Sequence, residues 1–126
     1  MNEWTFVVMS IVFYGSQGVL GQLRILDITG NNEETANPVW FSDQVQIIAR
    51  RMLAIEWLFN SQTIATFDSD TGEYTYPNTI NAVANTLSTD SILDLYNVTS
   101  INSGTYNVVG SSSRHQLNVT IHSNES

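Results

Sequence analysis

Apolar side chains recur at every second position in several short stretches of the chain. In the clearest stretch, Leu53, Ile55, Trp57 and Phe59 are each separated by one residue. Successive side chains of a β-strand point to opposite faces, so this period predicts a strand with these side chains facing the core. The outward-facing side chains would then be the residues in between and after: Ala54, Glu56, Leu58 and Asn60. A helix over residues 43–59 is the alternative, because Arg, Met, Leu, Ala and Glu favour helices.

Similar short runs extend along the rest of the chain. They cover residues 22–29, 44–47, 63–67, 93–98, 102–108 and 117–121. Turns rich in Gly, Asn, Asp and Ser separate several of them, as at 68–72 and 110–113. Short strands joined by polar turns predict a single all-β domain, an antiparallel sandwich over residues 19–122. Residues 123–126 would be a tail or a linker to a downstream region.

Composition and charge narrow the function classes. The 126 residues include 12 Asp and Glu against 4 Arg and no Lys, for a net charge of −8 and a pI of about 4.3. Nucleic acids and anionic lipid surfaces are recognised by clustered positive charge, so neither is an expected partner. The chain has no cysteine, which excludes disulfides, thiolate catalysis and cysteine-ligated zinc.

The first residues resemble a secretory leader. An apolar run over residues 6–14 precedes the small residues Gly15, Ser16 and Gly18, which is the order of an h-region and its cleavage zone. We therefore expect a signal peptide over residues 1–18, and a hydrophobic first strand is the alternative.

Three sequons support an extracellular glycoprotein. They place acceptor asparagines at Asn97, Asn118 and Asn124. No second apolar run of membrane-spanning length follows the leader, so attachment to a cell membrane would need an anchor downstream of this chain.

Two clusters of reactive side chains are weak candidates for chemistry. Ser111 to Ser113 lie close to His115, but neighbours on one turn rarely reach triad geometry, and no acid lies nearby to orient the ring. Residues 68–72 begin like a calcium loop, yet Thr79 stands where an EF-hand has its closing carboxylate. We therefore expect no enzyme activity, cofactor, metal ion or small-molecule substrate.

Two features resemble the immunoglobulin superfamily, and its variable-type domain in particular. One is Trp57 within an alternating strand. The other is Leu93-x-Leu95-x-Asn97-Val98, followed by Asn102-Ser103-Gly104-Thr105-Tyr106. The resemblance implies a sandwich with Trp57 buried between its sheets, a tight turn at Gly104, and a Tyr106 hydroxyl that hydrogen-bonds to upstream backbone.

The sequence departs from that family in informative ways. Val108 stands where the family has a cysteine, and its partner on the facing strand would be Val45 or Ile47. Loss of this disulfide costs about 2–5 kcal/mol, so apolar packing against Trp57 must offset it. Asn102 replaces the family's aspartate, and no arginine lies between residues 68 and 92 to pair with it.

Cysteine-free variable-type domains are found among adhesion receptors. The chain resembles the membrane-distal domains of carcinoembryonic-antigen-related adhesion molecules and of the SLAM group, and domain 1 of the hydroid (Hydractinia) allorecognition receptors. The resemblance implies the outer domain of a cell-surface receptor for homophilic cell adhesion or allorecognition, whose partner is the same protein on an opposing cell. A secreted or heterophilic ligand-binding protein, such as a decoy or immune modulator, is the alternative.

The expected binding face is the outer side of the sheet that carries Trp57 and Tyr106. Apolar side chains within a polar rim are typical of recognition sites. The alternation assigns to this face Glu56, Leu58, Asn60, Ile64, Thr105, Asn107 and Val109. Two copies of charge −8 repel each other, so Arg51 or Arg114 would have to meet an acid such as Glu56 or Asp68 across the interface.

Overall fold

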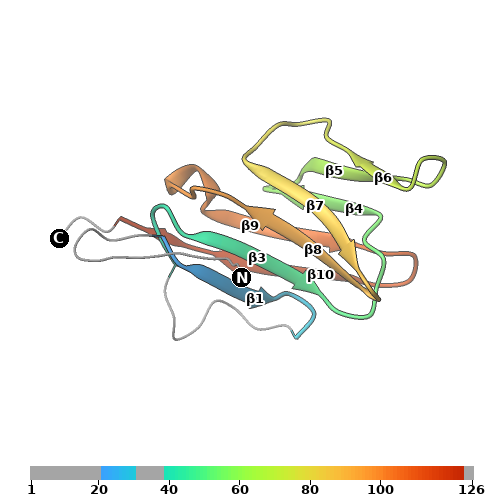
Figure 1. Ribbon diagram of the computed structural model, residues 1–126, viewed down its shortest axis with the longest axis horizontal. Coiled ribbons are helices and arrows are strands. Elements are labelled where there is room, and N and C mark those ends of the chain that lie inside the picture. Colours follow the sequence, from blue (N-terminus) through green and yellow to red (C-terminus); the bar gives the residue numbers. More distant parts are fainter. Residues whose placement is uncertain (1–20, 31–38, 124–126) are drawn as a thin grey trace, which may run out of the picture.

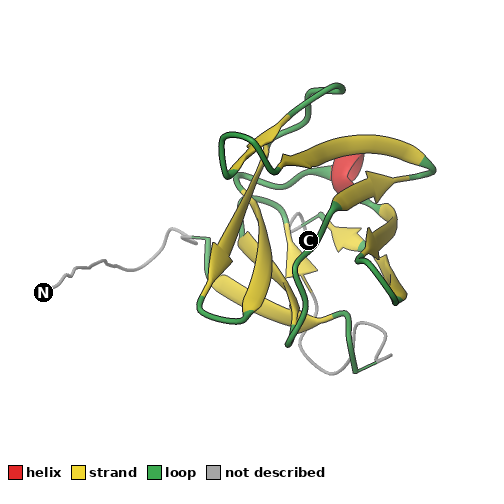
Figure 2. Cartoon of the chain, turned by 90° about the vertical axis from the view of Figure 1, so that its right-hand side faces the viewer, coloured by secondary structure: helices red, strands yellow, loops and turns green. Residues whose placement is uncertain are grey.

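The computed structural model describes residues 21–30 and 39–123. Within them the chain is built from strands and one 3-10 turn, η1 (Ser100–Asn102), as Figure 1 and Figure 2 show. The strands are β1 (Leu23–Asp27), β2 (Val39–Trp40), β3 (Gln44–Ala49), β4 (Glu56–Phe59), β5 (Gln62–Asp68), β6 (Glu73–Thr75), β7 (Ala82–Leu87), β8 (Asp90–Leu95), β9 (Gly104–Val109), β10 (Arg114–Val119) and β11 (Ile121–His122). The expected leader and the sequon at Asn124 lie outside the described residues.

The strands form two main sheets with the core between them. A four-stranded sheet has the order β1, β3, β8, β7, and a five-stranded sheet has the order β10, β9, β4, β5, β6. The pairs β1 with β3 and β2 with β11 are parallel, and the other pairs are antiparallel. The predicted all-β sandwich is confirmed. The alternative helix over 43–59 is wrong, because β3 and β4 occupy that segment and belong to different sheets.

The core is apolar and has no disulfide. Trp57 and Tyr106 are its largest fully buried side chains, and they come from the neighbouring strands β4 and β9. Val108 is fully buried as well, and so are both candidates for its partner, Val45 and Ile47 on β3. Leu93 and Leu95 add to the core from β8. Aliphatic packing therefore holds the two sheets together in place of a covalent link.

Tyr106 makes the hydrogen bond that the resemblance predicts. Its hydroxyl donates to the backbone carbonyl of Asn102 over 2.7 Å, and burial raises the pKa of the Tyr106 hydroxyl. The turn lies earlier than expected, because η1 ends at Asn102 and Gly104 already opens β9. Gly104 is required by close approach instead, since a Cβ there would lie only 2.5 Å from the Asn60 side chain.

Two amide side chains take the place of the ion pair that the sequence lacks. The buried Asn102 donates from Nδ2 to Oδ1 of Asn81 over 2.7 Å, and Asn81 Nδ2 donates to Oδ1 of Asn102 over 3.2 Å. Asn81 precedes β7 of the four-stranded sheet, whereas Asn102 precedes β9 of the five-stranded sheet. The pair therefore links the two sheets without any charge.

β4 begins three residues later than the alternation predicts. Residues 50–55 form the connection from β3, and the strand itself starts at Glu56. Leu53 and Ile55 are exposed and Ala54 is fully buried, which is the reverse of the expected pattern. The reason is local hydrogen bonding: the Ala54 N–H donates to Ser91 Oγ over 2.9 Å, and the Tyr74 hydroxyl donates to the Ala54 carbonyl over 2.6 Å.

Candidate recognition surface

The outward side chains of the five-stranded sheet, which we call the five-strand face, form rows across the strands. Directly paired residues on neighbouring strands share one face of a sheet, so the register sets the rows. The first row crosses all five strands: Arg114, Val109, Glu56, Thr66 and Thr75. The second row contains Gln116, Asn107, Leu58 and Thr63. A shorter third row pairs Asn118 with Thr105.

The expected face residues other than Ile64 lie on this face or in its β4–β5 turn. Partly exposed members are Glu56, Leu58, Thr105, Asn107 and Val109, and the turn residue Asn60 is exposed. Hydrogen bonds hold one end of the face in place. The Thr105 N–H donates to Asn60 Oδ1 over 2.9 Å, and the Asn60 N–H donates to the Thr105 carbonyl over 2.8 Å. The Thr63 hydroxyl donates to the Glu56 carboxylate, which fixes the acid in the middle of the first row.

Ile64 was expected on the outer face, and the structure corrects this. Trp57 pairs with Ala65, but the next residue, Leu58, pairs with Thr63. Ile64 is therefore the extra residue of a β-bulge, and its side chain enters the core beside that of Ala65 with only 2% of its surface exposed. A strict period of two cannot reveal an inserted residue. Leu58 and Val109 remain as the aliphatic side chains of the expected set.

Charges of both signs lie on the five-strand face. Arg114 and Glu56 share the first row, one strand to either side of Val109. Asp68 and Glu73 pair with each other across β5 and β6 at a corner of the sheet. Arg51, the other arginine expected at an interface, lies instead in the β3–β4 connection. The described residues contain no group of three potential metal ligands.

The two described sequons are exposed at different places. Asn118 lies on the five-strand face, where its Oδ1 accepts a hydrogen bond from Thr105 Oγ1 over 2.8 Å. Asn97 lies between β8 and η1. A glycan on Asn118 would therefore cover one end of the face, away from the row that contains Arg114 and Glu56. No helix in the described ranges is long and apolar enough to cross a membrane.

Solved structures with a similar arrangement of strands are immunoglobulin domains. The match to the Ig-like domain of human obscurin-like protein 1 includes 89% of this chain and 96% of that domain, at 15% sequence identity and a TM-score of 0.52. The CD2-binding domain of CD58 covers 81% of this chain at 12% identity and a TM-score of 0.53, with about half of that chain, 54%, included in the match. The fold is immunoglobulin-like.

A fragment of an immune receptor has the same fold. The extracellular fragment of novel immune-type receptor 11 from Ictalurus punctatus covers 79% of this chain and 96% of its own, at 10% identity and a TM-score of 0.50. No protein-family model and no curated protein matches the sequence. The similarity of this immunoglobulin-like domain to the matched structures is therefore limited to its fold.

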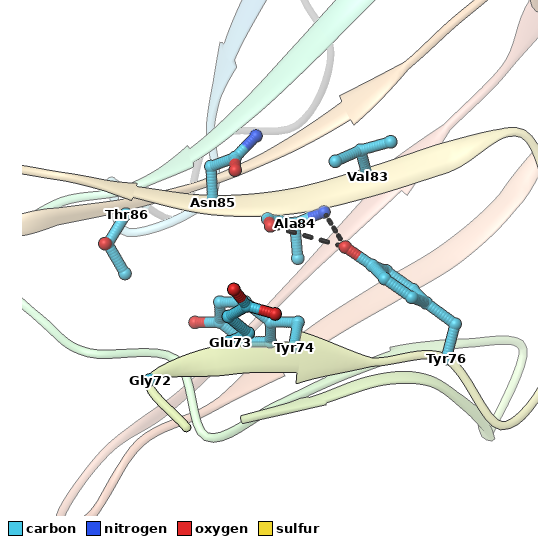
Figure 3. Close-up of a pocket in the computed structure, with 8 residues that line it drawn as sticks. All are labelled: Gly72, Glu73, Tyr74, Tyr76, Val83, Ala84, Asn85 and Thr86. Atoms are coloured by element: carbon cyan, nitrogen blue, oxygen red, sulfur yellow. Dashed lines mark hydrogen bonds between the residues drawn. The ribbon is translucent and has the colours of Figure 1, made fainter. Parts of the chain in front are cut away.

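A groove separates the free edges of the two sheets in this immunoglobulin-like domain. It has a volume of about 380 Å³ and runs between β6 and β7 (Figure 3). Tyr76 crosses the groove: the Ala84 N–H donates to its hydroxyl oxygen over 3.0 Å, and the hydroxyl lies 3.4 Å from the Ala84 carbonyl that it donates to. The phenol thus takes the place of a neighbouring strand at one point of the β7 edge, a form of edge protection.

The sequence pattern missed where exposed aliphatic side chains concentrate. Leu23, Ile25, Val83 and Leu87 are all at least two-fifths exposed, and they belong to β1 and β7 of the four-stranded sheet. In β7 the exposed Val83 lies between two alanines, so its hydrophobicity does not say which face of the strand is buried. Only the pairing with β8, whose Leu93 and Leu95 enter the core, decides the orientation.

Proposed function

We propose that this chain is a variable-type immunoglobulin domain, the outer recognition domain of a cell-surface receptor, and that it binds a second copy of itself through the five-strand face. The strand order supports the variable type. β5 and β6 extend the sheet formed by β10, β9 and β4, and a variable-type domain adds two strands to this sheet. The resemblance to adhesion and allorecognition receptors supports an extracellular location and a partner on an opposing cell.

The observation that carries the proposal is the order of charges in the first row. Arg114 and Glu56 lie one strand to either side of Val109, so each is about 5 Å from it across the sheet. A two-fold axis that runs along β9 above Val109 would place Arg114 of each copy opposite Glu56 of the other. A surface that pairs with itself under a two-fold axis must be complementary to itself, and this row meets that condition.

The second row supplies the apolar centre of the same interface. Leu58 lies beside Asn107, next to Val109 and Glu56 of the first row. Hydroxyl and amide side chains surround these aliphatic groups, as in a recognition site with a polar rim. The small apolar area and the net charge of −8 both favour weak association of single domains. Many copies on two opposing cells would then provide avidity.

A charge exchange tests this proposal. We expect sedimentation velocity of the purified protein to show a concentration-dependent dimer, which Glu56→Arg or Arg114→Glu weakens by about tenfold or more, because like charges then face each other. The double variant with both changes restores opposite charges and should dimerise again.

The matched control is Asp70→Arg, which makes the same charge change as Glu56→Arg in the β5–β6 turn. It should not weaken the dimer. A protein that stays monomeric at every concentration, or a double variant no better than the single ones, would contradict self-recognition through this row.

A further inference from the structure

The outward side chains of β1, β3, β8 and β7, which we call the four-strand face, surround a single recessed acid. The register places Ile25, Gln46, Asp94 and Val83 in one row across the whole sheet. Asp94 is only 7% exposed, whereas Ile25 and Val83 at the two ends of the row are 55% and 40% exposed. Asp94 is therefore largely covered within a row whose two end residues are exposed aliphatic side chains.

Neighbouring positions make the surroundings of Asp94 more apolar. Ile48 and Ile92 pair with each other in the adjacent row. Leu87, which pairs with Asp90 about 13 Å farther along β7, adds a 65% exposed aliphatic side chain to the same face but does not neighbour Asp94. On the other side, Tyr96 lies close enough for Asp94 to affect it: burial, and then the negative charge of Asp94, raise the pKa of the Tyr96 hydroxyl.

Asp94 has no cation to balance it in the described part of the chain. Its Oδ1 accepts a hydrogen bond from Gln44 Nε2 over 3.5 Å, at the limit of such a contact. By contrast, Asp27 on the same face is paired with Arg50 over 2.9 Å. The second oxygen of Asp94, Oδ2, has no hydrogen-bond partner in the part of the protein that the structure describes. Among the described residues, Trp57 Nε1 is the only fully buried polar side-chain atom that lacks a partner. Asp94 Oδ2 is therefore not fully buried, and solvent still reaches it.

We propose that the four-strand face binds a second, different protein, which presents an arginine from an apolar surface to Asp94. A carboxylate that is largely removed from water gains most from a cation that brings its own hydrogen-bond donors, and the guanidinium fits a carboxylate through two parallel N–H bonds. Aliphatic groups around that arginine would contact Val83, one strand away, and Ile25, two strands away at about 10 Å. Gln46, between Asp94 and Ile25, would offer its amide to the same partner.

A second copy of this chain does not fit the four-strand face. Besides Asp94, the face carries Asp90 opposite Leu87 at one end, where the Arg51 backbone N–H donates to the Asp90 carboxylate over 2.9 Å, and the Arg50 side chain already holds Asp27. Two such faces brought together would set Asp94 against acids, and in the described part of the chain no arginine is paired with Asp94 to balance it. This inference does not depend on the proposed self-recognition, because it concerns the opposite sheet.

A defined peptide probe tests the inference on the whole chain. The probe is a seven-residue peptide in which serine alternates with leucine, arginine and leucine, so that the arginine lies between two leucines on one side of an extended strand. We expect titration of the isotope-labelled protein to shift backbone amide signals of β3, β7 and β8. The version with glutamate in place of arginine should not shift them.

Three variants separate the proposed contact from general attraction to an acidic protein. Asp94→Asn should weaken binding of the arginine peptide about tenfold or more, whereas Asp70→Asn, with the same charge change in an exposed turn, should not. Ile25→Ser tests the aliphatic edge at an exposed position that can change without disturbing the core, and it should also weaken binding.

Several results would overturn the inference. Signal shifts confined to other strands, equal binding by Asp94→Asn and the unchanged protein, or equal shifts with the glutamate peptide would each exclude an arginine partner at Asp94. A dimer that becomes stronger in Asp94→Asn would show that the face pairs with a second copy instead.

Discussion

The two outer faces of the sandwich differ in the arrangement of their charges and aliphatic side chains. The five-strand face is rich in hydroxyl and amide groups and holds Arg114 and Glu56 in one row. The four-strand face has a recessed Asp94 between exposed aliphatic side chains and no free cation near it. A charged surface can pair with itself when it carries both signs of charge, whereas a surface whose charge is an unpaired acid is complementary to a cation on a different partner. We therefore propose a different kind of partner for each face.

Both faces depend on the same core, so the largest expected effect is on the fold itself. Trp57→Ala removes a fully buried side chain and should lower the free energy of unfolding by about 3–5 kcal/mol. The chain has no disulfide that would offset part of this loss. Urea unfolding followed by fluorescence of the remaining tryptophans measures this loss. Gln116→Ala on the exposed side of β10 is the control and should change stability by about 0.5 kcal/mol or less. Equal losses in the two variants would contradict a core centred on Trp57.

The amide pair that joins the two sheets should have the next largest effect. Asn102→Ala removes the donor to Asn81 Oδ1 and the acceptor of the Thr99 N–H, while Asn81 Nδ2 keeps its bond to the Tyr96 carbonyl, and we expect a loss of about 1–3 kcal/mol. In a double-mutant cycle, Asn81→Ala should cost less when Asn102 is already replaced, because the two share hydrogen bonds. The loss should be insensitive to salt, since the pair carries no charge. Fully additive losses would show that the two amides act separately.

A matched pair of arginine substitutions sharpens the contrast between the faces. Leu58→Arg lies at the proposed centre of the five-strand face and should raise the dissociation constant of the dimer about tenfold or more. Val83→Arg likewise replaces an outward aliphatic side chain by arginine, but on the four-strand face, and should leave the dimer intact. Sedimentation velocity of both variants at equal concentrations measures the difference. Loss of the dimer in Val83→Arg but not in Leu58→Arg would show that the protein pairs with itself through the four-strand face instead.

The smallest expected effect concerns the paired acid of the four-strand face. Burial tends to raise the pKa of Asp27, but hydrogen bonds from Thr29, Arg50 and Gly30 outweigh it and hold the pKa below its usual value of 3.8. This interaction stabilises the fold above pH 4 and is lost as the pH falls through the lower pKa of the folded state. Asp27→Asn should therefore show a smaller fall in unfolding temperature between pH 5 and pH 2 than the unchanged protein, measured by circular dichroism. An equal or larger fall would contradict the stabilising role of this pair.

The part of the chain from Leu93 to Val108 was the most predictable. Its leucines alternate, and the tyrosine near Gly104 has a specific structural role, so burial of Leu95 and the hydrogen bond from Tyr106 to backbone could both be predicted. The region from Leu53 to Ile64 was less predictable, although its alternation is more regular. There, hydrogen bonds turn Ala54 inward and a bulge turns Ile64 inward, and neither depends on hydrophobicity.

The candidate surfaces were predictable only in part, for the same reason. The alternation of β9 and β4 places Leu58, Asn107 and Val109 on one outer face, as expected. The four-strand face was missed because the aliphatic residues of β1 and β7 are equally suited to a core. Their exposure follows from their partners on β3 and β8, which are far away in the sequence.

The amino-acid sequence by itself determined the class of the fold, the lack of any disulfide, the acidic surface and the core positions around Trp57 and Tyr106. These follow from residue type and spacing along a strand, which are local properties. Only the tertiary structure decided that Ile64 is buried, that Asn81 replaces a missing cation, and that Arg114, Val109 and Glu56 form one row. It also decided that Asp94 lies recessed among aliphatic side chains. Each of these depends on the register between strands that are distant in sequence, and register is set by the packing of the two sheets as a whole.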